Sequence, residues 1–245
     1  MDHYEQQALR ELQQWQIRMN KKPSLFNGLT KGLQNKVNNV IPDKIHEIMT
    51  SAIKNIVRAA LLGSEFTTKK EVPSGLSLAE RERLVRERLR FYKKAAATEG
   101  AATGAGGLFL GLADFPLLLT LKMKFLFEVA AIYGFDIKDY RERLYILHLF
   151  QLAFSSDARR REVYQKVLNW EATILEFPSL QAIDWRRFQQ EYRDYIDLVK
   201  LLQLVPVVGA FIGAYANYHL LDNLGDTAMN GYRLRFLQQI TITPK

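Results

Sequence analysis

The side chains that most often carry out acid–base, nucleophilic or metal chemistry are scarce in this chain. Among 245 residues there is no cysteine and there are only four histidines. Without cysteine the chain forms no disulfide, offers no thiolate to zinc or to an iron–sulfur cluster, and has no thiol nucleophile. Any metal or proton-transfer chemistry must therefore use His3, His46, His148 and His219 together with carboxylates.

None of these histidines stands in a recognised catalytic or metal-binding pattern. His46 and Glu47 resemble the start of a zinc-protease motif, but the residue four positions after His46 is Thr50. The chain lacks a GxSxG nucleophile elbow, and the glycines of 104–107 lack the later Gly or Lys-Ser/Thr that a phosphate-binding loop requires. We therefore expect no cofactor and no metal, and we favour a protein without catalytic activity.

Two regions leave a chemical role open. His148 lies in the apolar stretch YILHLFQLAF, a setting that favours a hydrogen-bonded core histidine over an active-site base. His219, Asp222 and Asp226 form a polar cluster next to an apolar segment, and this cluster either binds an ion or a head group or satisfies buried helix ends; we favour the second. Further along the chain, Arg233 and Arg235 are interpreted as partners of Asp and Glu.

The elements that must position these residues are predicted to be helices, because apolar residues recur with a period of 3.6 along most of the chain. Asp2 with Glu5, and Ser77 with Glu80, have the spacing of a capping box. Gly134 is a natural helix end, and Asp136 with Asp139 is expected to cap a helix that runs to Phe154. Further helices are predicted at 24–40, 42–62, 156–175 and 184–204, with a last helical stretch through 232–237. The fold class is therefore all-α, a multi-helix bundle.

Two glycine-rich apolar helical segments, 100–121 and 201–221, distinguish the second half of the chain. Gly107-Leu-Phe-Leu-Gly111 resembles Gly209-Ala-Phe-Ile-Gly213, a short candidate internal repeat. Glycines four residues apart lie on one helix face and allow another backbone to approach closely. We expect these segments to contact membrane or a partner protein through Gly104, Gly107, Phe109, Gly111, Asp114, Pro116, Pro206, Gly209, Phe211, Gly213 and Asn217.

Whether these segments enter a bilayer or form a soluble core stays open at this point. About 20 apolar residues suffice to span the hydrocarbon core. A central Asp114 opposes spanning, and so do Gln203, Asn217 and His219, which favours a buried hairpin that dips into the membrane interface. Asp114 itself is interpreted as the N-cap of a helix that begins near Pro116, rather than as a catalytic acid.

The net charge of +8 is a regional property. Residues 1–100 contain 18 basic and 11 acidic side chains, whereas residues 101–245 are almost neutral. Cations on amphipathic helices suit anionic lipid head groups, and we expect contacts from Lys31, Lys36, Lys44, Lys54, Arg58, Arg81, Arg88 and Lys93. Nucleic acid is the rival polyanion, but recognised DNA or RNA motifs and aromatic stacking platforms are absent. Ion pairing among the interleaved acids of residues 78–94 is a third possibility.

The sequence resembles the EcsC family of bacterial proteins. The resemblance is carried by EGAATGAGGLFLGLADFPLLL (99–119), by AAIYGFDI (130–137) and by VPVVGAFIGAYANYHLLDNLGDTAMNGYRLRFL (205–237). It implies a bacterial protein associated with an operon for an ABC-type transporter, and it supplies no catalytic residues.

We expect one all-α EcsC-like domain over 1–245. In this domain 1–75 forms basic amphipathic helices and 76–245 the family core. The N-terminus lacks the basic and apolar regions of a secretory signal. We therefore expect a cytoplasmic protein that is peripheral to, or partly embedded in, the cell membrane, with ABC transporter subunits as further partners. A hydrolase using Asp114, His148, His219, Asp222 or Asp226, and a soluble nucleic-acid binder, are the alternatives.

Overall fold

The computed structural model describes residues 2–21, 43–62, 75–104, 115–179, 196 and 210–242. Regular structure in these parts is helical, apart from one isolated bridge between Ser155 and Ile196. The all-α prediction is confirmed for them. The elements are α1 (His3–Asn20), α3 (Asp43–Leu62), α4 (Leu78–Gly104), α6 (Phe115–Tyr133), α7 (Tyr140–Phe154), α8 (Arg160–Leu168), α9 (Trp170–Thr173), the 3₁₀ helix η2 (Ile174–Glu176) and α12 (Ala210–Ile242).

Helix boundaries follow the predicted capping signals. Asp2 accepts a hydrogen bond from the backbone N–H of Glu5, and the Glu5 carboxylate accepts one from the backbone of Asp2, which completes a capping box. Ser77 and Glu80 make the equivalent pair of contacts at the start of α4. Asp139 caps α7 through the N–H of Arg141.

The end of α6 is a Schellman motif. Gly134 has a φ of +91°, a conformation that glycine adopts without strain. The N–H of Phe135 donates to the carbonyl of Ala130, and the N–H of Gly134 donates to that of Ala131. Gly134 therefore ends the helix, as the sequence predicts.

Two predicted elements differ in extent. The helix expected at 156–175 is divided at Asn169, whose ψ of 43° is not helical and whose side-chain amide donates to the carbonyl of Gln165. Conversely, residues 210–221 of the second apolar segment and the stretch at 232–237 are parts of one continuous helix, α12, which extends to Ile242. The helices predicted at 24–40 and 184–204 lie outside the described residues.

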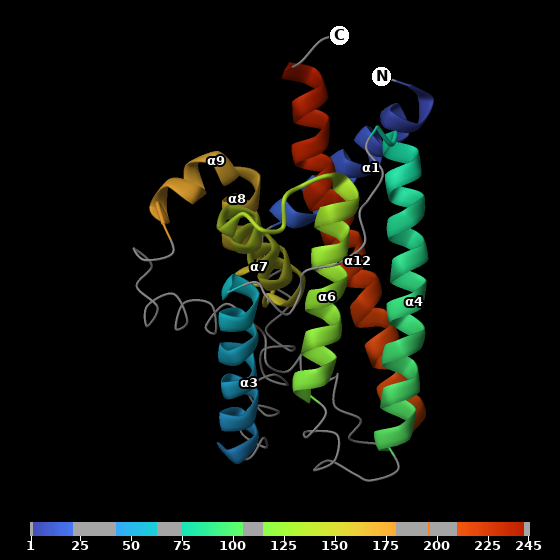
Figure 1. Ribbon diagram of the computed structural model, residues 1–245, viewed down its shortest axis with the longest axis vertical. Coiled ribbons are helices and arrows are strands. Elements are labelled where there is room, and N and C mark those ends of the chain that lie inside the picture. Colours follow the sequence, from blue (N-terminus) through green and yellow to red (C-terminus); the bar gives the residue numbers. More distant parts are fainter. Residues whose placement is uncertain are drawn as a thin grey trace.

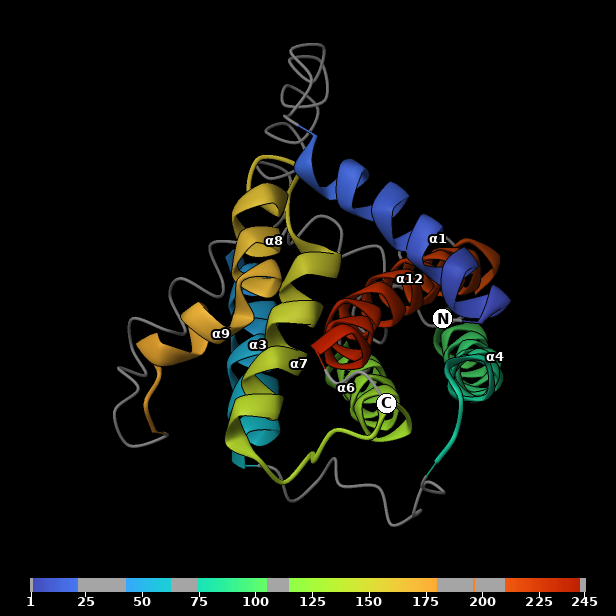
Figure 2. The ribbon, with the colours of Figure 1, turned by 90° about the horizontal axis from the view of Figure 1, so that it is seen from above.

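The bundle is arranged around α12. Helix α12 packs most extensively against α4, which runs antiparallel to it, and α6 lies next to both (Figure 1). Helix α1 crosses α12 and reaches from α4 to α8, as the end-on view shows (Figure 2). On the other side of α6, α3 packs against α6 and α7.

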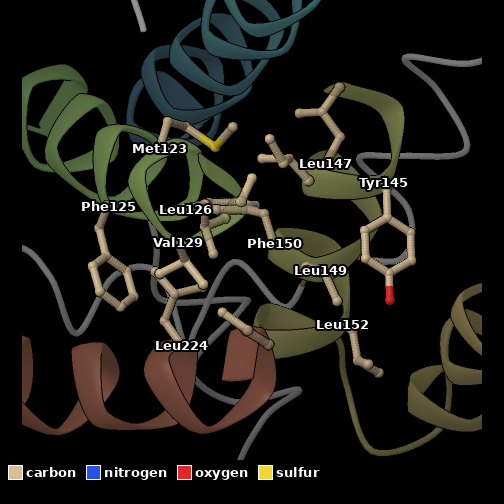
Figure 3. Packing of buried hydrophobic residues seen from close by; sticks show 14 of the residues in the cluster. Met123, Phe125, Leu126, Val129, Tyr145, Leu147, Leu149, Phe150, Leu152 and Leu224 are labelled. Atoms are coloured by element: carbon tan, nitrogen blue, oxygen red, sulfur yellow. The ribbon is translucent and has the colours of Figure 1, made fainter. Parts of the chain in front are cut away.

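The core lies where α6, α7 and α12 meet. Phe125 and Val129 of α6, Leu149 and Phe150 of α7, and Leu224 of α12 are each inaccessible to solvent and point toward one another (Figure 3). Within the described parts of the chain, no helix combines the length and apolarity that crossing a membrane requires.

Candidate functional site

The predicted contact residues of the two glycine-rich segments fall only partly within the described structure. Gly104 is the last residue of α4, and Phe211, Gly213 and Asn217 belong to the first part of α12. Pro116 lies in the first turn of α6 and is exposed. The remaining predicted contact residues, Gly107, Phe109, Gly111, Asp114, Pro206 and Gly209, lie outside the described residues.

Helix ends that flank both segments meet at one end of the bundle. The C-terminal end of α4 and the N-terminal ends of α6 and α12 all lie at the lower end in Figure 1, together with the N-terminal end of α3. We call this the flank end. Leu117, in the first turn of α6, is 45% exposed there, beside the exposed Pro116. Lys44, in the first turn of α3, is also exposed. The flank end therefore presents apolar side chains and a cation to solvent.

The predicted lipid-contacting cations of α4 are engaged inside the protein. The Arg81 guanidinium donates to the carbonyls of Leu76 and Ile132. Arg88 forms a bidentate ion pair with Glu128 of α6. The Lys93 ammonium contacts Asp222 of α12 and is 7% exposed.

These contacts turn Arg81, Arg88 and Lys93 toward neighbouring helices rather than toward a flat external surface. Other arginines of α4 are paired as well: Arg83 with Glu87, and Arg86 with Glu82. Ion pairs within the protein thus engage much of the positive charge of α4.

The cations of α3 are different. Lys44, Lys54 and Arg58 are exposed, and none of the described carboxylates forms an ion pair with any of them. Lys31 and Lys36 lie outside the described residues. Helix α3 therefore presents positive charge that remains available to an external anion, as do the exposed Arg90 and Lys94 of α4.

The polar cluster predicted around His219 does not converge on one point. Asp222 pairs with Lys93 of α4, whereas Asp226 pairs with Arg18 of α1 at 3.2 Å and accepts from the Asn230 amide at 3.0 Å. His219 is exposed near the beginning of α12. Since His219 and Arg233 are fourteen positions apart, which corresponds to about 21 Å of helix, the cluster is a row of separate contacts along α12.

Arg233 takes part in a buried ionic network around Glu82. The Glu82 carboxylate, fully buried, accepts hydrogen bonds from Arg233 Nε at 2.6 Å and Nη2 at 2.7 Å. Tyr4 and Tyr133 also donate to it, at 2.7 Å and 3.3 Å. Arg233 additionally pairs with Glu11 of α1 at 2.9 Å. Burial alone lowers the pKa of Arg233, but the hydrogen bonds and charge of Glu82 outweigh burial and raise it.

Arg235 takes part in a second buried network. Glu142 of α7 accepts from Arg235 Nη1 at 2.6 Å and from the Tyr232 hydroxyl at 2.6 Å. The guanidinium of Arg235 lies over the rings of Phe135 and Tyr145, with distances of 3.9 Å and 4.5 Å to the ring centroids. Burial raises the pKa of Glu142, although Arg235 opposes the shift.

Both networks tie helices together. Each carboxylate is surrounded by donors from other helices, and α1, α4, α6, α7 and α12 all contribute. The interpretation of Arg233 and Arg235 as partners of acidic residues is confirmed. The described residues also contain no group of three or more histidines and carboxylates placed to hold a metal ion.

His148 is a core histidine, as predicted. It is 3% exposed, and its Nδ1–H donates to the carbonyl of Leu144 at 2.8 Å. The ring packs edge-on against Trp170. Burial lowers the pKa of His148 to about 4, so the ring is neutral at physiological pH. It lies in α7, and its ring also packs edge-on against Phe177.

Sequence reasoning missed Glu82 and Glu142, the carboxylates at the centres of the two networks. A signal for Glu82 was present: with Leu78, Val85 and Leu89 it occupies the i, i+4, i+7, i+11 positions of one helix face. A carboxylate on such an apolar face requires a buried cation as its partner. The spacing does not reveal that this cation comes from position 233.

Comparisons with known proteins show the family to which this chain belongs. The model of the EcsC protein family matches residues 6–237. The chain is 48% identical to Protein EcsC of Bacillus subtilis (strain 168) over 96% of its own length and 97% of that protein. It is 35% identical to the uncharacterized protein YdbA of the same organism, over 58% of this chain and 52% of YdbA. No solved structure matches. This chain belongs to the EcsC protein family.

Proposed function

We propose that this protein works by interaction at the cytoplasmic face of the cell membrane. In this proposal the cations of α3 bind anionic lipid head groups, and the apolar flank end contacts the membrane interface or the subunits of an ABC-type transporter. The protein is peripheral or partly embedded and acts as an accessory to the transporter.

The observation that carries this proposal is the flank end itself. Exposed apolar residues, Pro116 and Leu117, occur at the same end as the helix termini that lead into both glycine-rich apolar segments. The exposed cation Lys44 begins the neighbouring helix. An apolar tip next to unpaired cations is the combination that lets a protein bind an anionic bilayer without spanning it.

The alternatives lack such support. A hydrolase needs its groups to meet at one point, but His148 is enclosed in the core while His219, Asp222 and Asp226 are distributed along α12. A nucleic-acid binder needs a broad cationic surface. Within the described residues, ion pairs occupy several arginines of α4, which reduces the positive charge that this helix presents to solvent.

Co-sedimentation with vesicles tests the lipid contact. The protein is mixed with vesicles of phosphatidylglycerol and phosphatidylcholine in equal amounts, and with vesicles of phosphatidylcholine alone. We expect binding to the anionic vesicles. The variant Lys44→Gln/Lys54→Gln/Arg58→Gln should bind them roughly 100-fold more weakly, since each cation near the surface contributes about 1 kcal/mol.

The matched control removes the same charge from α4. Arg83, Arg90 and Lys94 are exposed, and the variant Arg83→Gln/Arg90→Gln/Lys94→Gln should retain most of the vesicle binding. If both variants lose binding equally, only net charge matters and the assignment to α3 is wrong. If the unmodified protein ignores anionic vesicles, the lipid contact itself is refuted.

The transporter contact has its own test. Leu117→Asp places a charge at the flank end without changing the core, because Leu117 is 45% exposed. We expect this variant to lose co-purification with the transporter while remaining folded. Lys138→Asp, at an exposed position in the loop after α6, serves as the control and should leave co-purification unchanged.

A further inference from the structure

A groove of about 640 Å³ lies between α3 and α6. The apolar part of its lining, which we call the floor, consists of Ile48, Ala52, Ile56, Ala59 and Pro116. Glu47, Ser51, Asn55 and Thr120 form the polar part. Pockets that bind small molecules usually have volumes of about 300–1,000 Å³. The lining residues of α3 extend over three turns, which corresponds to about 18 Å along the helix. The groove is therefore long enough and apolar enough to hold an extended hydrocarbon chain.

Different faces of α3 carry different kinds of side chain. An α-helix has 3.6 residues per turn, so residues at i, i+3, i+4 and i+7 share a face. Met49, Ile53, Val57 and Ala60 form its buried face. Ser51 and Asn55 line the groove on the exposed side, and Lys54 and Arg58 follow them around the helix. We call these four residues the cationic stripe: Ser51, Lys54, Asn55 and Arg58.

None of the described carboxylates neutralises the charge of the cationic stripe. Lys54 and Arg58 are exposed and form no ion pair with a described carboxylate. Side chains four residues apart lie about 5–6 Å from each other on a helix, so both can contact one phosphate. After Glu47, which lines the groove toward its N-terminal end, α3 contains no further acidic residue. Glu47 precedes Lys54 by seven residues, about 10 Å of helix, so it does not compensate the pair.

We propose that this groove binds one anionic phospholipid, with an acyl chain on the apolar floor and the phosphate between Lys54 and Arg58. Charge complementarity identifies the occupant. The apolar floor suits a hydrocarbon chain. Lys54 and Arg58, which pair with no described carboxylate, suit a single anionic head group. The inference rests on the proposed function, because the membrane surface supplies the lipid. It adds a specific lipid site to what is otherwise a diffuse electrostatic attachment.

Calorimetric titration of the full chain with lysophosphatidylglycerol, below the concentration at which it forms micelles, tests the site directly. We expect saturable binding of one molecule, and lysophosphatidylcholine should bind more weakly because its head group carries no net charge. The variant Lys54→Gln/Arg58→Gln should lower the affinity for lysophosphatidylglycerol about 30-fold. If the variant binds as well as the original chain, the phosphate assignment is wrong.

A second variant tests the groove rather than the charge. Ser51 lines the groove and is exposed, so Ser51→Trp fills the channel from its solvent side without displacing the core. This variant should lose the binding of both lysolipids. Ala172→Trp, at an exposed position on α9, is the matched control and should bind both normally. Circular dichroism and thermal unfolding verify that both variants are folded.

The vesicle experiment separates failure of this inference from failure of the proposed function. Ser51→Trp should still sediment with phosphatidylglycerol vesicles, since its α3 cations and flank end are intact. Normal lysolipid binding by Ser51→Trp overturns the groove site but leaves membrane attachment standing. Lysolipid binding without vesicle binding supports the groove and refutes the membrane attachment. If no lysolipid binds and Ser51→Trp instead blocks a transporter subunit, the groove is a protein-docking site and the lipid proposal is wrong.

Discussion

At the scale of single residues, the defining feature is the placement of ionised side chains in the core. Glu82 is fully buried, and Arg233 is 4% exposed. Moving a carboxylate and a guanidinium out of water costs several kcal/mol each, and their mutual hydrogen bonds offset this cost only while both are present. The two tyrosines that also donate to Glu82 come from α1 and α6, so a single carboxylate fixes the positions of several helices.

We predict that Arg233→Ala strongly destabilises the protein. The substitution removes the closest cation from the buried Glu82 carboxylate and leaves it only the longer ion pair with Arg86, at 3.5 Å. Removing one partner of a buried pair typically costs about 3–5 kcal/mol. Chemical denaturation measures the change in the free energy of unfolding. Arg83→Ala is the control: its partner Glu87 lies one turn away on the surface, and the loss should be about 0.3–0.5 kcal/mol. Equal losses in the two variants would contradict the burial argument.

We also predict a loss of stability in acid that depends on His148. Its pKa is about 4 in the folded protein, against an ordinary value of 6.5. As the pH falls below 6.5, the unfolded chain takes up a proton that the folded chain does not, so folding is progressively disfavoured until the pH reaches the folded pKa. This single group should reduce the free energy of unfolding by about 2–3 kcal/mol between pH 7 and pH 4.5.

The variant His148→Asn isolates this effect. The Asn amide keeps a donor near the position of Nδ1 but does not titrate, so the difference in stability between original and variant should shrink as the pH falls. Urea denaturation at several pH values measures it. Parallel pH profiles for the two proteins would show that His148 does not contribute.

At the scale of elements, α12 stays helical through two glycines that lie at its contacts with neighbouring helices. Glycine disfavours helix by about 1 kcal/mol, and α12 contains Gly225 and Gly231. A Cβ at Gly231 would lie 2.4 Å from Leu149 Cδ2, and one at Gly225 would lie 2.8 Å from Leu89 Cδ2. Both glycines therefore stand where side chains of α7 and α4 approach the α12 backbone.

We predict that Gly231→Ala is destabilising and that Gly225→Ala is better tolerated. Leu149 is completely buried, so it cannot turn toward solvent to make room for the new Cβ, and overpacking of this kind typically costs about 1–3 kcal/mol. Leu89 is partly exposed and can shift, so the gain in helix propensity from Gly to Ala offsets the free-energy cost of the close contact. Thermal unfolding of both variants measures the difference. A Gly231→Ala variant more stable than Gly225→Ala would contradict the packing described for α7 and α12.

At the scale of the whole molecule, the net charge of +8 separates into two parts with different roles. On α4 many cations join helices to one another, whereas on α3 they face solvent. Internal pairs are shielded from salt by burial, but exposed charges are screened over about 10 Å at 0.1 M ionic strength and about 3 Å at 1 M. Salt should therefore act on attachment to membranes and not on folding.

We accordingly predict that high salt releases the protein from phosphatidylglycerol vesicles while leaving its thermal unfolding temperature nearly unchanged. Sedimentation and differential scanning fluorimetry across a salt series measure the two properties. Persistent binding at 1 M salt would show that apolar contacts at the flank end hold the protein to the bilayer. A parallel fall in unfolding temperature would instead show that the measured release reflects loss of the fold.

Much of the local structure could be read from short stretches of sequence. The capping boxes at Asp2 and Ser77 and the glycine at 134 fix helix boundaries through contacts between residues a few positions apart. The core environment of His148 follows in the same way from the apolar residues that surround it in the chain. Apolar periodicity likewise predicted α3 and the all-α class, because one helix face must be buried wherever such a helix folds.

The tertiary structure alone decided which charges are internal and which are available to a ligand. Arg88, Lys93 and Arg58 are indistinguishable as cations in the sequence, yet the first two reach carboxylates on α6 and α12 and the third reaches none of the described carboxylates. The partners lie 40 and 129 positions away. Pairing over such separations depends on how helices pack, and no local pattern of residues encodes it. The sequence thus determined where several helices begin and that the first hundred residues are basic. Packing determined that Arg88 and Lys93 are paired inside the protein, whereas Lys54 and Arg58 of α3 are exposed and pair with no described carboxylate.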